Sequence, residues 1–363
     1  MKTNILIVLL LTLPLVATGQ ATLQKEEQRV AKIDPRSTED FFQYVFDYEV
    51  IALKGDGDFI LPSLRLIGAT TDRIFATTKS IRRNAVYVFD GKGNHIVTIK
   101  RGGQGPGEYL GIRSVIPYGD GFGLVDVLGQ KVLVFDNMGS YQKELKLDYT
   151  TAGLIRGADG FFAVLPEDMS LKHGKIGVLD EAFQLDTAFL DGGMAVKSRI
   201  MSGGEIQSVP GGFAYAETNT TGIYHGNSEE VWPAYYFDFG SYNPEINENG
   251  VPALNDKVSL ITFGETRDCV YLEYALGLRN YQLSVYSKRD GMVTNHSLKQ
   301  LVGEELLGMS TGDDMWRYIP IPAPAVEKLI EKLKLESATF ASGLSAEDVL
   351  ESENPMILKF RFF

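Results

Sequence analysis

The first residues that could do chemistry lie in a glycine-rich stretch at 101–109, with the sequence RGGQGPGEY. Glycine permits unusual backbone angles and close approach, so exposed amides here could form part of a ligand-binding surface together with Arg101, Gln104, Glu108 and Tyr109. In a second interpretation, which we favour, the stretch is a crossover between two strands and Tyr109 is a plug. The stretch does not fit the G-x-G-x-x-G pattern and lacks a following Lys-Ser/Thr, so it does not indicate nucleotide binding.

A second group of candidates falls in loops that we expect between the second and third strands of repeated units. These loops open on the same face as the glycine-rich stretch. Arginine presents a planar fork of donors that suits a carboxylate, so the loops could bind a sugar acid or a peptide carboxylate. The alternative is an ordinary solvated rim. The candidate residues are Arg82, Arg83, Gln130, Arg279 and Asn280.

Other patterns give no support for catalysis. The segment 308–312 (GMSTG) matches the G-x-S-x-G nucleophile elbow, but that elbow needs a strand and a helix in a parallel α/β sheet, so we interpret the match as chance. There is no H-E-x-x-H motif and no cysteine cluster. Carboxylate-only calcium binding in a central channel is conceivable but has no supporting spacing. We therefore expect no catalytic residue, no metal site and no cofactor.

Composition narrows the class of partner. The chain has 363 residues, with 35 basic and 47 acidic side chains and a net charge of -12. Nucleic-acid binding is a poor fit, because neutralising phosphates needs a basic surface. The single cysteine, Cys269, lies in an apolar run and cannot form an internal disulfide, so we expect a buried, inert thiol.

The N-terminus has the pattern of a signal peptide. Lys2 precedes an apolar run at 5–16 that is too short to span a bilayer, and Ala17-Thr18-Gly19 is a small-residue cleavage site. We predict a signal peptide at 1–19, then a polar N-terminal segment at 20–43 with little regular structure. No cysteine follows the apolar run for lipid anchoring, and no other stretch is apolar enough to cross a membrane. The predicted location is periplasmic or secreted.

Repeats along the chain predict the scaffold that holds these candidate residues. An apolar pentamer recurs with starts 46, 44, 46 and 61 residues apart. In the first two copies both alternating faces are apolar, so these strands must be covered on both sides. Turn signals before and after each pentamer add further strands, giving four-stranded antiparallel units of about 45 residues, the period of a β-propeller blade. The pentamers are Val86–Asp90, Val132–Asp136, Ile176–Asp180, Gly222–Gly226 and Leu283–Ser287.

Five such blades run from Leu64 to about Ser297, and the two chain ends predict a sixth. Within that blade, 322–336 has one apolar helical face and 345–348 resembles a capping box, so we predict a short helical insertion at about 322–350. The blade's predicted strands are Leu301–Thr311, Trp316–Ile321 and Pro355–Phe363, the last pairing with Tyr44–Leu53. The sequence thus predicts an all-β protein with one six-bladed β-propeller domain at 44–363, closed by its N- and C-terminal strands.

These residues resemble a known family. The segments 101–109, 122–126 and 132–136, with Gly139, closely resemble an NHL-type propeller repeat. The chain is similar to a family of exported bacterial six-bladed β-propellers of unassigned function, and Glu353–Leu358 is similar to that family's C-terminal signature. Many members are lipoproteins, whereas this chain lacks the lipobox cysteine. The resemblance implies a fold and a compartment but no activity.

Three functional hypotheses follow. The favoured one is an exported, non-catalytic binding module, monomeric, for a protein, peptide or glycan of the cell envelope. The alternative is a propeller enzyme of lactonase or lyase type with a metal site in the central channel, which requires converging Asp, Glu, Asn or His side chains on inner strands. The third is a structural partner in a larger envelope assembly.

Overall fold

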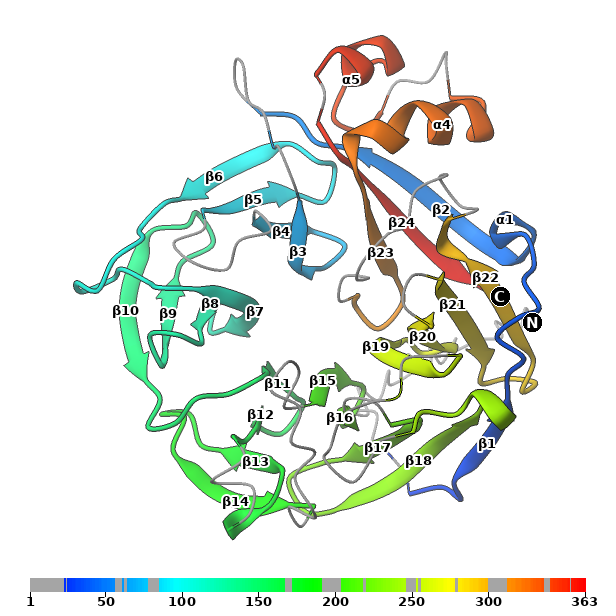
Figure 1. Ribbon diagram of the computed structural model, residues 1–363. Helices are drawn as coiled ribbons and strands as arrows, with labels where there is room; N and C mark the ends of the chain where they lie inside the picture. The colour runs from blue at the N-terminus through cyan, green and yellow to red at the C-terminus, as the bar shows by residue number, and fades with distance from the viewer. Residues whose placement is uncertain are drawn as a thin grey trace, which may run out of the picture.

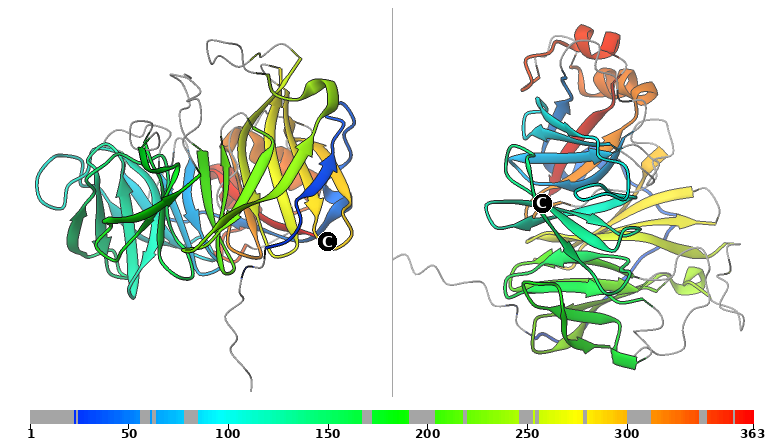
Figure 2. Two further views of the ribbon diagram at one scale, coloured as in Figure 1. Left: turned by 90° about the horizontal axis from the view of Figure 1, so that it is seen from below. Right: turned by 90° about the vertical axis from the view of Figure 1, so that its left-hand side faces the viewer.

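The computed structural model describes residues 23, 25–55, 61, 64–77, 85–166, 172–190, 204–217, 220–245, 253, 256–277, 280–299, 312–335, 340–352 and 354–363. These residues form six sheets arranged as blades around a central axis (Figure 1). Seen edge-on, the ring is a flattened disc (Figure 2). The predicted six-bladed β-propeller of four-stranded antiparallel sheets is confirmed.

The first three sheets each contain four antiparallel strands that follow one another in sequence, from the axis outwards. The first consists of β3 (Arg65–Ala69), β4 (Arg73–Thr77), β5 (Val86–Asp90) and β6 (His95–Ile99). The second consists of β7 (Ile112–Tyr118), β8 (Gly121–Asp126), β9 (Lys131–Phe135) and β10 (Tyr141–Lys146). The third consists of β11 (Leu154–Arg156), β12 (Phe161–Val164), β13 (Ile176–Leu179) and β14 (Leu185–Phe189).

The remaining sheets vary this plan. The fourth contains β15 (Gly204–Val209), β16 (Gly212–Glu217), β17 (Gly222–Gly226) and β18 (Val231–Asp238), followed by a short 3-10 helix, η1 (Gly240–Tyr242). The fifth contains β19 (Val258–Glu265), β20 (Cys269–Leu276), β21 (Asn280–Ser287) and β22 (Val293–Ser297). The described strands of the sixth are β23 (Arg317–Ile321), β24 (Met356–Phe362) and β2 (Val45–Ala52). The strand expected at Leu301–Thr311 lies outside the described residues.

The repeated pentamers are the third strands of their sheets. Every residue of β9 and β13 is buried, and Val86, Val88 and Phe89 of β5 have no exposed surface. Neighbouring sheets cover both faces of these strands, which explains why neither face is polar. The prediction from double-sided apolar character is confirmed.

The turns after the pentamers repeat one geometry. Asp90 and Asp136 each accept hydrogen bonds from two backbone amides of their own turn, at 2.8–2.9 Å. The turn is completed by a residue with positive φ, Gly93 (92°) or Gly139 (80°), where glycine carries no Cβ strain. In the third sheet Asp180 accepts the same pair of bonds, but Phe183 takes this position with φ of 61°.

The chain ends close the ring as predicted. β2 pairs antiparallel with β24 in a register that places Val50 opposite Leu358 and Ala52 opposite Met356. β24 also pairs with β23, so the sixth sheet joins segments from both ends of the chain. This pairing removes the exposed edges that an open ring would leave.

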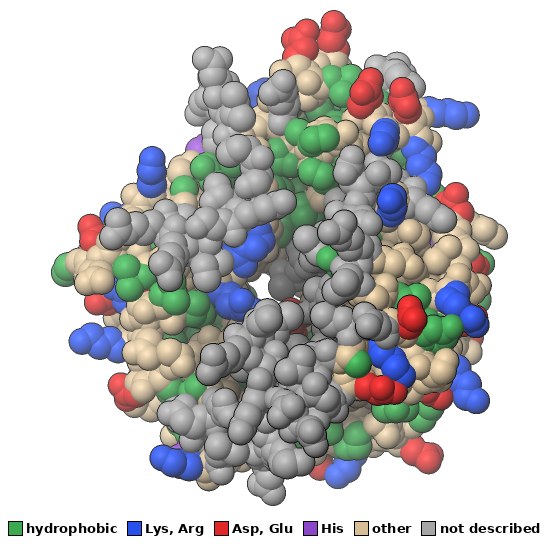
Figure 3. Space-filling view, in the orientation of Figure 1, with side chains coloured by type: hydrophobic (Ala, Val, Ile, Leu, Met, Phe, Trp, Pro, Cys, Tyr) green, Lys and Arg blue, Asp and Glu red, His purple; other side chains and the backbone are tan. Residues whose placement is uncertain are grey.

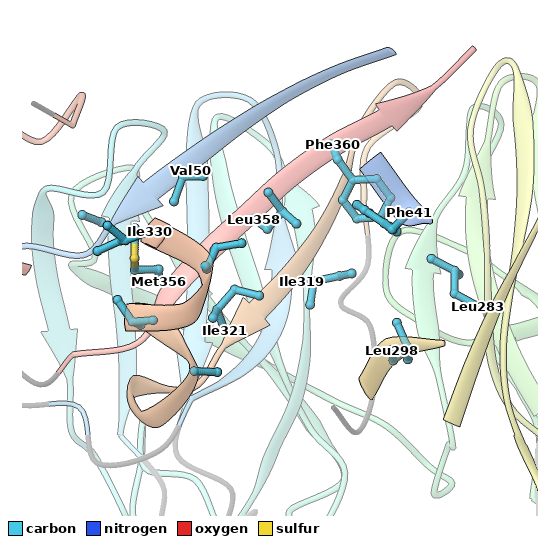
Figure 4. Close-up of a cluster of buried hydrophobic side chains, with 14 of the residues drawn as sticks. Phe41, Val50, Leu283, Leu298, Ile319, Ile321, Ile330, Met356, Leu358 and Phe360 are labelled. Atoms are coloured by element: carbon cyan, nitrogen blue, oxygen red, sulfur yellow. The ribbon is translucent and has the colours of Figure 1, made fainter. Parts of the chain in front are cut away.

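Helices α4 (Ala323–Leu333) and α5 (Ala346–Ser352) lie outside the ring, against the sixth sheet (Figures 1 and 2). The predicted apolar face of α4 is confirmed, because Val326, Leu329 and Ile330 are buried. They belong to a cluster with Ile319, Ile321, Met356 and Leu358 of the sheet (Figure 4). The capping box before α5 is also present: the Ser345 hydroxyl accepts from Asp348 N at 3.1 Å. No described helix is long and apolar enough to cross a membrane.

The N-terminal segment is more ordered than expected. β1 (Arg29–Lys32) pairs in parallel with β18, adding a fifth strand to the fourth sheet. A one-turn helix, α1 (Phe41–Tyr44), then buries Phe41 against Phe360 and Phe362 of β24. The polar composition of 20–43 concealed these elements, because each depends on contacts with strands far away in the sequence.

Candidate functional site

A cavity of about 1190 Å³ occupies the centre of the ring. Its described walls come from the innermost strands of five sheets, β3, β7, β11, β15 and β19, and from residues around the start of β23. Figure 3 shows an opening at the centre of the molecule with basic side chains at its rim. Each of the five strands is an edge strand of its sheet, so the backbone groups of its free edge, which faces the axis, border the cavity.

Two arginines at the beginnings of adjacent inner strands line this cavity. Arg65 donates from Nη1 and Nη2 to the carbonyls of Arg113 and Ile112, at 3.3 and 2.9 Å. Arg113 in turn donates from Nε to the carbonyl of Ala152, at 2.8 Å. Burial, and secondarily the charge of Arg113, lowers the pKa of Arg65 to about 10. Each guanidinium is therefore fixed to the next sheet through neutral carbonyls.

A carboxyl group lies on another wall of the cavity. Glu205 of β15 accepts a hydrogen bond from the hydroxyl of Thr262 on β19. Burial raises the pKa of Glu205, while the Thr262 hydrogen bond and the charge of Arg113 oppose that rise. The arrangement gives the cavity a hydrogen-bonding group that is half-buried and close to positive charge.

A third arginine, Arg317 at the start of β23, is fully buried beside the cavity. Its guanidinium lies flat against Gly264 of β19, where a Cβ would collide with it, and over the ring of Tyr271 at 5.8 Å. Burial lowers its pKa, and the neighbouring Tyr271 and Glu273 oppose the change. Gly264 is thus required by close approach rather than by a turn.

The other charged groups lining the cavity are engaged within the described chain. Arg73 donates to Asn137 O at 2.6 Å, and Arg156 pairs with Glu181 at 3.0 Å. Asp313 accepts from Trp316 N at 2.7 Å. By contrast, neither Arg65 nor Arg113 forms an ion pair with any described carboxylate. Positive charge therefore accumulates where these two inner strands begin.

The glycine-rich stretch forms the expected crossover, from β6 to β7. Tyr109 is fully buried, its hydroxyl donates to Ile99 O at 2.8 Å, and burial raises its pKa to about 12. Glu108 accepts from Gly105 N at 2.8 Å and so ties the loop to itself. Arg101 and Gln104 are exposed, with Arg101 over the ring of Tyr141 at 5.3 Å. Their binding of a ligand stays a prediction.

The loop candidates are divided by their positions. Gln130 is exposed, and its loop lies beside the glycine-rich stretch, because Asp126 accepts from Leu110 N and Gly111 N at 2.9 Å. Asn280 is exposed at the start of β21. None of these residues is among the described residues that line the cavity. The remaining candidates, Arg82, Arg83 and Arg279, lie outside the described residues.

The sequence reasoning missed the cavity residues Arg65, Arg113, Glu205 and Arg317. A detectable signal was present, because Arg65 and Arg113 stand eight residues before Arg73 and Gly121, at the same position of two repeats. A charged side chain at the start of an innermost strand must lie near the axis. The sequence-based candidates were taken from loops, so this position at the start of the innermost strands was not among them.

A second buried polar cluster lies between the fourth and fifth sheets. Glu265 is 2% exposed and contacts His225 Nε2 at 2.8 Å and Lys288 Nζ at 2.6 Å. Burial alone would raise its pKa, but His225 and Lys288 outweigh burial and lower it. The Gln207 side chain, from the cavity wall, hydrogen-bonds to the Glu265 backbone at 2.7 and 2.9 Å. We interpret the cluster as a tie between sheets.

Known proteins share this arrangement of six radial sheets. Residues 19–313 match the family DUF5128, described as a 6-bladed beta-propeller. The chain belongs to this family. The resemblance to a propeller family without assigned function is thereby confirmed. No curated protein matches the sequence.

Solved structures of other members of this fold are similar. One is a predicted exported protein from Bacteroides fragilis, with 18% identity and a TM-score of 0.72 over 93% of this chain and 100% of that chain. Another, a DUF4221 member from Bacteroides vulgatus, has 9% identity and a TM-score of 0.51 over 88% of this chain and 97% of that one. At these identities the DUF5128 chain shares a fold with them, and nothing finer follows.

Proposed function

We propose that this DUF5128 propeller is an exported, non-catalytic binding module whose ligand, a peptide or glycan of the cell envelope, enters the central cavity. The observation that carries the proposal is the cavity itself, which combines fixed guanidinium groups with partly exposed aliphatic walls at Val115, Ile155 and Ile206. A concave, mostly apolar site with a few converging polar groups is typical of ligand binding.

A screen by thermal shift tests this proposal. Envelope-derived peptides and glycans are added to the purified protein, and a ligand present at a hundredfold excess over its Kd stabilises the fold by about 2.7 kcal/mol. Ile155→Trp, which places a large ring in the cavity, abolishes the shift. The matched control Val30→Trp, at a 63% exposed position on β1, keeps it. A ligand that shifts both variants equally binds elsewhere and contradicts the cavity assignment.

The lactonase or lyase alternative depends on a metal. Among the described residues, no group of three or more His, Cys, Asp or Glu side chains could hold a metal ion. Metal analysis of the purified protein, with chelator-sensitive hydrolysis or elimination of a cyclic ester as the second readout, decides between the two proposals. Stoichiometric metal with turnover would favour the enzyme.

The export proposal rests on the N-terminal pattern at 1–19. N-terminal sequencing of the mature protein, together with cell fractionation, tests it. The expected result is a chain beginning at Gln20 outside the cytoplasm. An intact Met1 in the cytoplasmic fraction would contradict it.

A further inference from the structure

The cavity holds more positive charge than its described walls neutralise. The basic groups Arg65 and Arg113 stand one sheet apart, and Arg65 hydrogen-bonds to the backbone of Arg113 itself. Both side chains line the cavity, and the charge of Arg113 acts on Arg65 and helps to lower its pKa. A bound anion would relieve the repulsion between two such charges. The whole chain carries a net charge of -12, so this concentration of positive charge is local.

The described acid nearest to this pair does not form an ion pair with it. Glu205 is hydrogen-bonded to Thr262 and lies near the charges of both Arg113 and Arg317, and the surroundings of Arg317 also include Glu273. Arg317 therefore has acidic neighbours on its own side of the cavity. The Arg65–Arg113 pair has no carboxylate within ion-pairing distance in the described chain, and a carboxylate from a ligand would match two guanidinium forks.

The wall beside this pair is aliphatic. Val115 follows two residues after Arg113, and Ile155 and Ile206 line the adjacent strands, each partly exposed. The described aromatic residues of the lining, Phe75, Phe122 and Phe263, are buried in the sheets and offer no open ring face. Sugar rings pack against open aromatic faces, whereas aliphatic side chains pack against aliphatic walls, so the described lining favours a peptide over a glycan.

The strand edges add a second feature that suits a peptide. β3, β7, β11 and β15 are edge strands that run beside the axis. An extended peptide can add to such an edge through backbone hydrogen bonds, with its alternate side chains in pockets of the wall. A chain end that stops at the arginines would place its carboxylate against them.

We propose that the cavity binds a peptide as an extended strand, with its free C-terminal carboxylate held by Arg65 and Arg113 and its last side chain, aliphatic, against Val115. This inference rests on the proposed function, because it assumes that the ligand occupies the cavity. It goes further because it names the end of the ligand that is bound and the two residues that bind it.

The test uses the purified full-length mature protein and two hexapeptide libraries with three randomised C-terminal positions. One library carries free C-terminal carboxylates and the other carries C-terminal amides. The immobilised protein retains free-acid peptides ending in Val, Leu or Ile. In calorimetry, amidation weakens the best of these peptides by roughly tenfold to a hundredfold, as expected for charge-assisted hydrogen bonds.

Variants locate the carboxylate. Arg113→Gln and Arg65→Gln each lower affinity for the acid peptide by about the same factor and leave affinity for the amide unchanged. Arg289→Gln, at a 77% exposed position that pairs with its neighbour Asp290, is the matched control and binds like wild type. Arg113 is exposed, and its one side-chain hydrogen bond to another described residue is that to Ala152 O, so its variant remains informative if Arg65→Gln fails to fold.

The outcomes separate the two proposals. Equal binding of acid and amide peptides overturns the carboxylate subsite but leaves a binding cavity. A second outcome is that the protein retains a glycan, that Ile155→Trp blocks this binding, and that neither peptide library is retained. This outcome overturns the inference but agrees with the proposed function. Failure of every peptide and every glycan to bind the wild-type cavity overturns both.

Discussion

The glycine-rich loop and the central cavity both contain arginine and glutamate, but they satisfy these groups differently. In the loop, the Glu108 carboxylate accepts a hydrogen bond from Gly105 N, and the Tyr109 hydroxyl donates one to Ile99 O. In the cavity, Arg65 and Arg113 are held by carbonyls, which fix the guanidinium groups without neutralising them. The cavity therefore keeps positive charge that its carbonyl partners do not neutralise, whereas the polar groups of Glu108 and Tyr109 are used within the loop and its neighbouring strand.

The largest expected effect tests the structural role of the loop. Tyr109→Ala removes a fully buried ring and lowers the free energy of unfolding by about 3–5 kcal/mol, measured by urea denaturation. Tyr109→Phe keeps the ring and loses only the bond to Ile99 O, so it costs about 1 kcal/mol. Gln104→Ala, at an exposed position of the same loop, changes stability by less than about 0.5 kcal/mol. Equal losses of stability in the three variants would contradict the structural role of Tyr109 in the loop.

An intermediate effect is expected at the cavity wall. In Gly264→Ala the new Cβ displaces the Arg317 guanidinium, and overpacking of this kind lowers the free energy of unfolding by about 1–3 kcal/mol. The control Gly160→Ala places its Cβ at ordinary contact distance, 3.7 Å from Leu179 O, and is expected to be nearly neutral. Chemical denaturation of both variants gives the difference. If Gly264→Ala leaves the stability unchanged, the Arg317 guanidinium can adopt another position without a cost in free energy.

The smallest expected effect is on how folding stability depends on pH, which should differ between Glu205 in the cavity and Asp136 in an exposed turn. Burial raises the pKa of Glu205 in the folded state, so its carboxyl binds a proton more readily folded than unfolded. Wild-type stability therefore falls as the pH rises from the unfolded pKa through the higher folded pKa, and Glu205→Gln removes this fall.

Asp136, in the exposed turn after β9, has the opposite effect on the pH dependence of stability. Hydrogen bonds from Ser140 N and Met138 N lower its pKa, so its contribution is present above the unfolded pKa and is lost as the pH falls through the folded value. Thermal unfolding between pH 2 and pH 8 compares Glu205→Gln with Asp136→Asn. Identical pH profiles for the two variants would contradict the assignment of separate environments.

The sequence predicts the ring well, because the information is local and repeated. Val132–Phe135 is apolar on both faces, which only a strand covered on two sides explains, and the pairing of 45–52 with 356–362 follows from the need for closure. β1 was missed because RVAK is short and alternates weakly, and its partner Tyr235–Asp238 is some 200 residues away.

The candidate site was less predictable. Arg65 is a charged residue at the first position of a strand and so looks like a solvated strand end in the sequence. Its neighbour Arg113 lies 48 residues later, and only the ring brings the two together. The carbonyl bonds that fix them involve main-chain atoms, which leave no trace in side-chain patterns. Conversely, Tyr109 was correctly placed as a plug in the favoured interpretation.

The pairing of β2 with β24 also has a kinetic consequence. β2 leaves the ribosome early, but its partner strand at 356–362 emerges about 300 residues later. The first five sheets can form before β2 finds its partner, yet the ring stays open until residues 356–362 have been made. A chain truncated before Met356 should therefore remain open, expose the unpaired edges of β2 and β23, and be cleaved by proteases that spare the full-length protein.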